Sequence, residues 1–215
     1  MWQQWSLSME NKITLYGASG HCKVIIDILQ NNGVPIEVIV DDNPNIKTIL
    51  GIPVLISNQN DNRTLKNVIV SIGNNRIRKI IVSRLNGTFS KAIHPRSTVS
   101  AYAKIDEGTV VMAGVVINPD VAIGRHCILN TAATVDHDCT IEDFVHISPN
   151  VSLAGGVYVG EGAHIGIGAT VIQEIRIGKW TTIGAGAVII NDVPDYAVVV
   201  GNPGRVIKYN SIENE

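Results

Sequence analysis

An aliphatic residue recurs every six positions in the second half of the chain, and no other feature restricts the possible folds as strongly. From Ile93 in steps of six to Ile189, every position is Ile, Val or Leu. The positions are Ile93, Val99, Ile105, Val111, Ile117, Ile123, Leu129, Val135, Ile141, Ile147, Leu153, Val159, Ile165, Val171, Ile177, Ile183 and Ile189. The fourth residue after each is small or β-branched, and glycine often follows the aliphatic residue directly.

A period kept without a slip from Ile93 to Ile189 indicates a coil of short strands joined by tight turns. One aliphatic side chain per hexapeptide then points into a narrow interior and stacks on its equivalent in the next coil. The glycines are expected to permit the backbone conformations that the corners need. A β-sandwich is disfavoured, because irregular strands would not keep one register for this distance.

The first part of the chain follows a different pattern, in which short apolar strands alternate with amphipathic helices. This alternation predicts a small parallel sheet covered by helices. The expected strands are 13–16, 37–40 and 68–73, and the expected helices are about 21–32 and 74–85.

Gly17 and Gly20 lie where the first strand turns into a helix, which brings free backbone N–H groups and a positive helix end together. Such a turn suits a phosphate group. Asp41 ends the second strand, where an acid can accept hydrogen bonds from a ribose or a base. The full G-x-G-x-x-G fingerprint is absent, so a nicotinamide dinucleotide has weak support. A plain tight turn with a solvated acidic loop is the alternative.

Composition limits the partners and the location. The net charge of −2 and the lack of a long basic run argue against nucleic acid and anionic membranes. No apolar stretch approaches the ~18 residues of a membrane span, so we expect no membrane insertion. Cys22, Cys127 and Cys139 form no C-x-x-C pair, which favours reduced thiols and a cytoplasmic protein. The first residues lack the pattern of a signal peptide, and 1–11 are expected to be a disordered leader.

Several motifs occur in a characteristic order, namely GASGH, VDD, SIGNN, IHPRSTVS, VDHDC and VGNPGRVI. This order resembles the sugar acetyltransferases of the sialic acid O-acetyltransferase type, within the hexapeptide-repeat acyltransferases. Within that group it is most similar to the N-acetyltransferases of nucleotide-linked 4-amino sugars. The resemblance runs from about Lys12 to Lys208.

The resemblance implies a mixed fold, with a small α/β Rossmann-like parallel sheet followed by a left-handed parallel β-helix. Its coils take three hexapeptides each, and the left hand comes from the family. The implied domains are 12–92 for the nucleotide sugar and 93–208 for acetyl-CoA, with a tail at 209–215. The family also implies a homotrimer whose active sites lie in clefts between subunits.

The resemblance assigns residues to the two substrates and to no metal. Contacts to the nucleotide sugar are implied for Ala18, Ser19, Gly20, Asp41, Asp42 and Gly73, with Asn74 and Asn75 beside them. Contacts to acetyl-CoA are implied for His146, Ala154, Gly155, Ile167 and Ala185. A backbone N–H of Ala154–Gly155 would face the thioester carbonyl and stabilise the developing oxyanion. His146 precedes His164 by one implied coil, so the two rings should stack.

His137 lies two residues after the interior position Val135, and the equivalent place in the next hexapeptide is Asp143. The histidine is therefore not a repeated structural feature. The resemblance implies that His137 is the general base, oriented by Asp138. A histidine with a pKa near the working pH can take the proton of an attacking amine. Taken alone, the residues fit a surface histidine with acidic neighbours equally well. Strand alternation would turn Asp136 and Asp138 away from the ring unless the chain turns here.

These expectations combine into an acetyl-CoA-dependent N-acetyltransferase acting on a nucleotide-linked 4-amino-dideoxy sugar for bacterial surface glycan synthesis. An O-acetyltransferase of the sialic acid type is the nearest alternative, because the residues do not distinguish amine from hydroxyl. A zinc protein like the γ-class carbonic anhydrases would need three of His126, His137, His146 and His164 to converge. A non-catalytic sugar-nucleotide binder is the remaining alternative.

Overall fold

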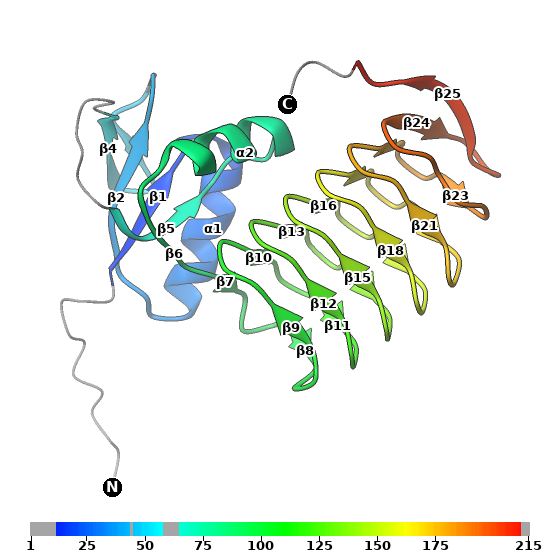
Figure 1. Ribbon diagram of the computed structural model, residues 1–215. Helices are drawn as coiled ribbons and strands as arrows, with labels where there is room; N and C mark the ends of the chain where they lie inside the picture. Colours follow the sequence, from blue (N-terminus) through cyan, green and yellow to red (C-terminus); the bar gives the residue numbers. More distant parts are fainter. Residues whose placement is uncertain (1–11, 44, 58–64, 212–215) are drawn as a thin grey trace, which may run out of the picture.

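The computed structural model describes residues 12–43, 45–57 and 65–211. The expected leader at 1–11 and most of the expected tail lie outside these residues. Figure 1 shows an N-terminal α/β domain beside a long coil of parallel strands. Among the described residues, no helix is long and apolar enough to cross a membrane.

The N-terminal domain is a six-stranded sheet in the order β3-β4-β2-β1-β5-β6, with only the β3–β4 pair antiparallel. Its strands are β1 (Ile13–Tyr16), β2 (Ile36–Asp41), β3 (Thr48–Ile49), β4 (Ile52–Ile56), β5 (Leu65–Val70) and β6 (Gly87–Phe89). Its helices are α1 (Gly20–Asn31) and α2 (Asn75–Arg84). The predicted parallel sheet with helices is confirmed. The sequence analysis missed β3, β4 and β6, which are short or lack an alternating pattern.

The predicted strand at 68–73 is too long at its C-terminal end, because β5 ends at Val70. The Ser71 hydroxyl donates to the carbonyls of Tyr16 and Gly17, at 3.0 and 2.6 Å. These bonds hold the start of a loop against the end of β1. The residues that follow β5 are therefore free to leave the sheet before α2 begins.

The coil is a left-handed parallel β-helix with three faces, as expected. The first face contains β7 (Ala92–Ile93), β10 (Val110–Val111), β13 (Ile128–Leu129), β16 (His146–Ile147), β19 (His164–Ile165), β22 (Thr182–Ile183), β24 (Ala197–Val200) and the antiparallel β25 (Arg205–Tyr209). The second contains β8 (Thr98–Val99), β11 (Val116–Ile117), β14 (Thr134–Val135), β17 (Ser152–Leu153), β20 (Thr170–Val171) and β23 (Val188–Ile189). The third contains β9 (Lys104–Ile105), β12 (Ala122–Ile123), β15 (Thr140–Ile141), β18 (Tyr158–Val159) and β21 (Arg176–Ile177).

The register explains the six-residue period. Val110 pairs with Ile128 and Val111 with Leu129, eighteen positions further on, and the same spacing recurs on every face. The repeated aliphatic residues from Val111 to Ile189 are all buried. Ile93, Val99 and Ile105 are partly buried, because they close the open end of the coil. Each buried aliphatic side chain contributes about 1.5–3 kcal/mol to folding.

From residue 108 to residue 186, each corner contains one residue in the left-handed conformation, three positions after the aliphatic residue, with φ between +54° and +72°. The corner residues are Gly108, Gly114, Asp120, His126, Ala132, Asp138, Phe144, Asn150, Gly156, Gly162, Gly168, Glu174, Trp180 and Gly186. The expected role of the glycines that directly follow the aliphatic residues is therefore wrong. A Cβ on Gly124 would lie 2.8 Å from the backbone nitrogen of Asp143. Those glycines allow coils to approach closely, and their φ is not positive.

Ala132 and Gly114 occupy equivalent corners one coil apart, which gives a stability prediction. The left-handed conformation costs an L-residue ~1–2 kcal/mol. Glycine avoids this cost, but it loses about 0.5–1 kcal/mol more conformational entropy on folding than alanine does. Ala132→Gly should therefore raise the free energy of unfolding by about 0.5–1 kcal/mol. Gly114→Ala should lower it by about 1 kcal/mol. Denaturant titrations of both variants check the signs, and a destabilised Ala132→Gly protein would contradict this account of the corners.

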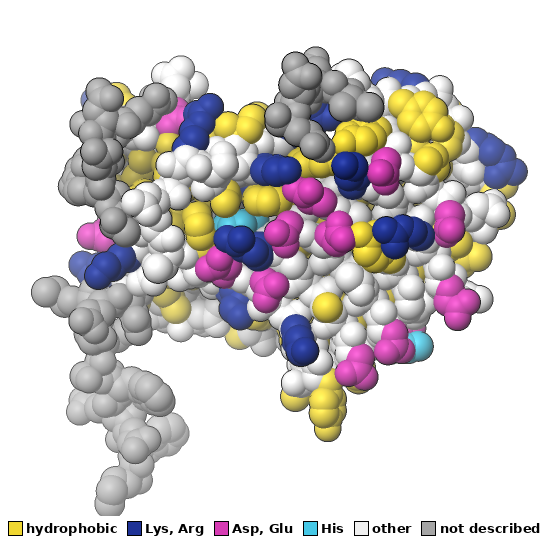
Figure 2. Space-filling view, viewed as in Figure 1, with side chains coloured by type: hydrophobic (Ala, Val, Ile, Leu, Met, Phe, Trp, Pro, Cys, Tyr) yellow, Lys and Arg dark blue, Asp and Glu magenta, His cyan; other side chains and the backbone are white. Residues whose placement is uncertain are grey.

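The three edges of the coil have different surroundings. We name them by their corner residues: the domain edge (108, 126, 144, 162 and 180), the His137 edge (120, 138, 156 and 174) and the Ile167 edge (114, 132, 150, 168 and 186). Helix α2 packs on the domain edge, where Asn75 Nδ2 donates to the carbonyls of Gly162 and Ala163, both at 3.1 Å. The last described residue also reaches α2, where Arg76 Nη2 donates to the Ser211 carbonyl at 3.0 Å. Basic and acidic side chains are interspersed over the face in Figure 2.

Candidate active site

The six predicted nucleotide-contacting residues lie at the carboxyl ends of three neighbouring strands. Ala18, Ser19 and Gly20 follow β1, Asp41 ends β2 and precedes Asp42, and Gly73 lies in the loop after β5. The strand order places β1 between β2 and β5, so the chain changes direction across the sheet at β1. Crevices at such a point are the usual ligand sites of parallel sheets.

Not every polar group in this crevice is available to a ligand. The Ala18 N–H donates to Asp41 Oδ2 at 2.7 Å, and Asn43 N–H donates to Asp41 Oδ1 at 2.9 Å. The Tyr16 hydroxyl donates to Asp42. The Ser19 side chain makes no capping bond to α1, although Ser19 occupies the N-cap position. With respect to the residues that the structure describes, the exposed Ser19 hydroxyl and the first amides of α1 are therefore the free donors of this turn.

Asn74 and Asn75 have structural partners. Asn74 Oδ1 accepts the Ile77 N–H at 3.0 Å and caps α2. Asn75 is buried and bridges to the β-helix through Gly162 and Ala163. The SIGNN motif therefore begins a helix and docks it.

His137 lies at a corner of the β-helix, immediately after β14. The left-handed conformation of Asp138, with φ of +61°, folds its carboxylate back onto the imidazole. Asp138 Oδ2 lies 2.7 Å from His137 Nδ1, and the two side chains are 60% and 65% exposed. Because the chain turns at this corner, the side chains do not alternate as they would along a strand. The short side chain of Asp138 therefore reaches the imidazole of His137.

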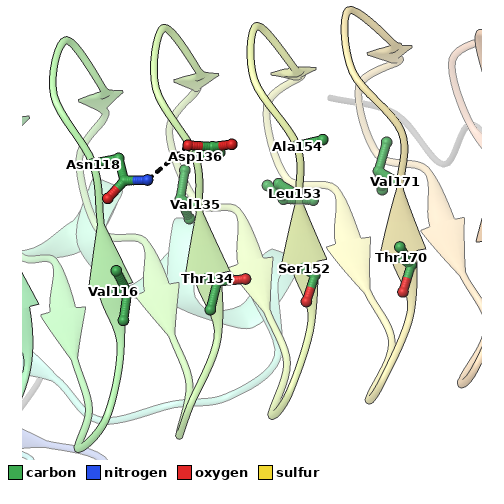
Figure 3. A pocket seen from close by; sticks show the side chains of 10 residues that line it. All are labelled: Val116, Asn118, Thr134, Val135, Asp136, Ser152, Leu153, Ala154, Thr170 and Val171. Atoms are coloured by element: carbon green, nitrogen blue, oxygen red, sulfur yellow. Dashed lines mark hydrogen bonds between the residues drawn. The ribbon is translucent and has the colours of Figure 1, made fainter.

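Asp136 supports the same corner through the backbone. Its Oδ1 accepts the His137 N–H at 2.8 Å and Asn118 Nδ2 at 2.6 Å. Figure 3 shows Asn118, Asp136 and Ala154 in a row along a shallow pocket on the second face. Asp136 therefore holds the main chain, whereas Asp138 holds the ring.

Gly155 lies one coil above His137 and contacts the imidazole. A Cβ on Gly155 would lie 2.7 Å from His137 Cε1 and 2.8 Å from Nε2. The Ala154 N–H already donates to the Val171 carbonyl at 3.1 Å. Within the described residues the Gly155 N–H has no acceptor. Of the two predicted amides, only that of Gly155 is available to an oxyanion.

The carboxylates also set the charge state of His137. The hydrogen bond to Asp138, with the nearby charge of Asp136, raises the pKa of His137. Asp136 itself has a lowered pKa, chiefly because Asn118 donates to it. Nδ1 is thereby the protonated nitrogen of the neutral ring, which leaves the lone pair on Nε2 beside Gly155.

His146 and His164 stack, as their spacing predicts. Their rings are 4.8 Å apart and nearly parallel, on adjacent strands of the first face. The Asn130 amide lies 3.1 Å from His146 Nε2. Burial lowers the pKa of His146 to about 3. The predicted cofactor residue His146 is therefore a neutral ring at the junction of the two domains.

Ile167 and Ala185 are exposed and lie one coil apart at corners of the Ile167 edge, away from Gly155 on the His137 edge. The five predicted acetyl-CoA residues are therefore not all brought together within one chain. Ala154 and Gly155 are next to His137, whereas Ile167 and Ala185 are on another edge.

The histidines do not form a metal site in the described part of the chain. No group of three or more His, Cys, Asp or Glu side chains gathers there in a metal-binding arrangement. His126 is buried between Phe89 and Phe144 and touches neither His137 nor the stacked pair.

The sequence analysis missed Asn118 and Arg78. The signal for Asn118 was present, because it precedes Asp136 by eighteen residues and so lies directly beside it. Arg78 had no such signal, because nothing in the sequence of the predicted helix 74–85 indicates that this arginine is buried.

Solved structures resemble this chain over nearly its whole length. A variant of GDP-perosamine N-acetyltransferase from Caulobacter crescentus, with a histidine replaced by alanine and in complex with CoA and GDP-perosamine, is 38% identical. It superposes with a TM-score of 0.87 over 92% of this chain and 97% of that one. The chain belongs to the hexapeptide-repeat sugar acetyltransferases. A second member of this sugar acetyltransferase family, the acetyltransferase domain of PglB from Neisseria gonorrhoeae FA1090 in complex with acetyl coenzyme A, is 37% identical. Its TM-score is 0.83 over 92% of this chain and all of that one.

Sequence comparisons add partial matches over shorter parts of the chain. The family model described as the PglD N-terminal domain matches residues 12–85. The serine acetyltransferase of Bacillus pumilus is 38% identical over 107 residues, which cover 45% of this chain and 49% of the relative. The chain thus spans about half the length of this curated relative.

Proposed function

We propose that the protein transfers the acetyl group of acetyl-CoA to the amino group of a nucleotide-linked 4-amino-dideoxy sugar, for bacterial surface glycan synthesis. The observation that carries the proposal is the His137 corner. An exposed imidazole, held at Nδ1 by Asp138, lies against Gly155, whose N–H has no acceptor among the described residues. The likeness to solved relatives that hold CoA together with an amino-sugar nucleotide supports the choice of substrates.

The proposed reaction is a nucleophilic substitution at the thioester carbonyl carbon of acetyl-CoA. The sugar amine attacks the thioester carbonyl carbon, and His137 Nε2 takes the proton that the nitrogen loses. The carbonyl oxygen becomes an oxyanion, to which the Gly155 N–H can donate. Collapse of the tetrahedral intermediate forms the amide and breaks the carbon–sulfur bond. The proton on His137 then neutralises the departing CoA thiolate.

The remaining roles divide between the domains. Ala18, Ser19, Gly20, Asp41, Asp42 and Gly73 form the proposed nucleotide site. His146, Ala154, Gly155, Ile167 and Ala185 form the proposed acetyl-CoA site. Asp138 orients the base, and no metal takes part in the proposal.

We further propose a homotrimer, because the two sets of acetyl-CoA residues lie on different edges of one chain. A threefold arrangement would bring the His137 edge of one copy beside the Ile167 edge of the next. Light scattering of the purified protein tests this assembly, and a monomer under assay conditions would contradict it. The three free, buried cysteines favour a cytoplasmic location.

The decisive experiment incubates the protein with acetyl-CoA and a panel of nucleotide-linked 4-amino sugars carrying uridine, guanosine, thymidine or cytidine. Thiol release is followed, and mass spectrometry identifies the product. The 4-hydroxy analogues and free sialic acid are tested in parallel. Acetylation of an amine supports the proposal, whereas turnover of the hydroxyl substrates alone would replace it with an O-acetyltransferase. No thiol release from any acceptor would refute acetyl transfer.

Asp138→Asn provides a pH test of the base. General base catalysis needs neutral His137, so kcat/KM should rise with pH through the pKa of that ring in the free enzyme. Asp138 raises this pKa above its ordinary value of ~6.5, so replacing Asp138 should shift the rising limb of the profile to lower pH. The plateau should fall ~10-fold or more, because the ring loses its orienting partner. The pH dependence of kcat/KM is measured for the wild-type protein and for Asp138→Asn. A rising limb at the same pH in both proteins would contradict the role of Asp138.

A further inference from the structure

The guanidinium of Arg78 is buried at the junction of the two domains. Arg78 lies in α2, is 1% exposed, and is surrounded by backbone carbonyls. Its Nε donates to the His126 carbonyl and its Nη2 to the Phe144 carbonyl, both at 2.8 Å. Its Nη1 donates to the Ile72 carbonyl at 3.0 Å and to the Gly73 carbonyl at 3.3 Å.

These carbonyls belong to two separate parts of the protein. His126 and Phe144 are successive corners of the domain edge, and Ile72 and Gly73 form the loop between β5 and α2. One planar side chain therefore joins this loop to two coils of the β-helix. Asn75 extends the connection, because its Oδ1 accepts Arg78 Nη2 at 2.8 Å while its Nδ2 reaches the next coil.

No described carboxylate pairs with Arg78, so the charge is held by carbonyl dipoles alone. Burial lowers the pKa of Arg78 to about 10, and the guanidinium therefore stays charged at neutral pH. A planar fork of donors holds several acceptors in one geometry, which the single ammonium of a lysine cannot reproduce. The retained positive charge also favours an anionic ligand near the Gly73 loop.

The loop that Arg78 holds is part of the proposed nucleotide site. Gly73 follows β5 at the crevice between the strand ends, and its carbonyl accepts a hydrogen bond from Arg78 Nη1. A shift of this loop would therefore change the shape of the crevice and its distance from the β-helix.

We propose that Arg78 is a positioning residue that fixes the Gly73 loop against the β-helix and thereby sets the affinity for the nucleotide part of the substrate. The inference rests on the proposed function, because it assigns the loop to nucleotide binding. It adds a residue that touches neither proposed substrate.

The test compares Arg78→Lys and Arg78→Met with the wild-type protein and with Arg84→Met. Arg84 is an exposed arginine in the last turn of the same helix and serves as the matched control. Calorimetry measures the Kd of UDP, GDP, dTDP and CDP, and separately the Kd of CoA. For the preferred diphosphate, Kd should rise ~10-fold in Arg78→Lys and further in Arg78→Met, because a displaced loop loses hydrogen bonds to the charged phosphates. The Kd of CoA should stay within about twofold of wild type, and Arg84→Met should match wild type.

Thermal unfolding establishes that each variant is folded, and Arg78→Lys decides the question if Arg78→Met does not fold. Equal nucleotide affinity in Arg78→Lys and wild type would overturn the inference. A parallel loss of nucleotide and CoA affinity in Arg78→Lys would also overturn it, because the residue would then only support the fold. A different result tests the proposed function: it is refuted if the wild-type protein releases no thiol with any acceptor. An active enzyme whose Arg78→Lys variant keeps the wild-type KM for the sugar would refute the inference alone.

Discussion

Replacing His137 by alanine is expected to lower kcat/KM for acetyl transfer ~10²–10⁴-fold, the usual contribution of a positioned general base. The imidazole of His137 is exposed at a corner of the β-helix, and its Nε2 lies beside Gly155. Without it, the attacking amine has no group to receive its proton. Because the side chain is exposed and packs little, the fold and the Kd of CoA should remain close to wild type.

The experiment measures kcat/KM by thiol release and the Kd of CoA by calorimetry. Added imidazole should restore part of the activity of His137→Ala, since it can occupy the vacated space. Asp120→Asn is the matched control, because Asp120 is the exposed corner residue one coil before Asp138 and asparagine tolerates its φ of +61°. Wild-type turnover in His137→Ala would refute the assignment of the base.

Gly155→Ala should be nearly as damaging to catalysis while leaving the fold intact. The new methyl group would meet the end of the His137 side chain, at 2.7–2.8 Å in the present arrangement. An exposed ring can swing away at little cost in stability. That movement would separate Nε2 from the Gly155 N–H, and misplacement by about 1 Å costs ~10²-fold in rate.

Gly114→Ala provides the opposite signature, because it strains a left-handed corner where a Cβ would meet nothing closer than 3.7 Å. We expect Gly114→Ala to lose stability and keep kcat/KM, and Gly155→Ala to keep stability and lose kcat/KM. Denaturant titration and the thiol assay on both proteins provide the comparison. Equal stability losses in the two variants, or full activity in Gly155→Ala, would contradict the contact between Gly155 and the base.

Much of the site was predictable because it follows the eighteen-residue coil. Adjacent strands pair residues that are eighteen apart, so Asn118 must lie beside Asp136, and Gly155 beside His137. The stack of His146 on His164 follows from the same rule. The reach of Asp138 to the ring also depends on local geometry, namely the left-handed corner that recurs every six residues.

Other features had no local pattern to predict them. From the sequence, the N–H groups of Ala154 and Gly155 were both candidates for binding the oxyanion. In the structure the Ala154 N–H donates to the Val171 carbonyl, so among the described residues only the Gly155 N–H is free. Asn74 and Asn75 read as possible ligand contacts, yet they cap and dock α2. The segment 74–85 was predicted as an amphipathic helix, but no pattern indicated that Arg78 in it is among the most buried side chains.

The amino-acid sequence by itself therefore determined the β-helix, the parallel sheet and the neighbours along each face, because a repeat specifies its own short-range pairing. Only the tertiary structure decided which edge receives α2, how Arg78 joins the Gly73 loop to that edge, and which predicted residues lie on separate edges. These arrangements depend on contacts between segments far apart in the chain. Such contacts satisfy buried donors and acceptors individually, and no periodic pattern records them.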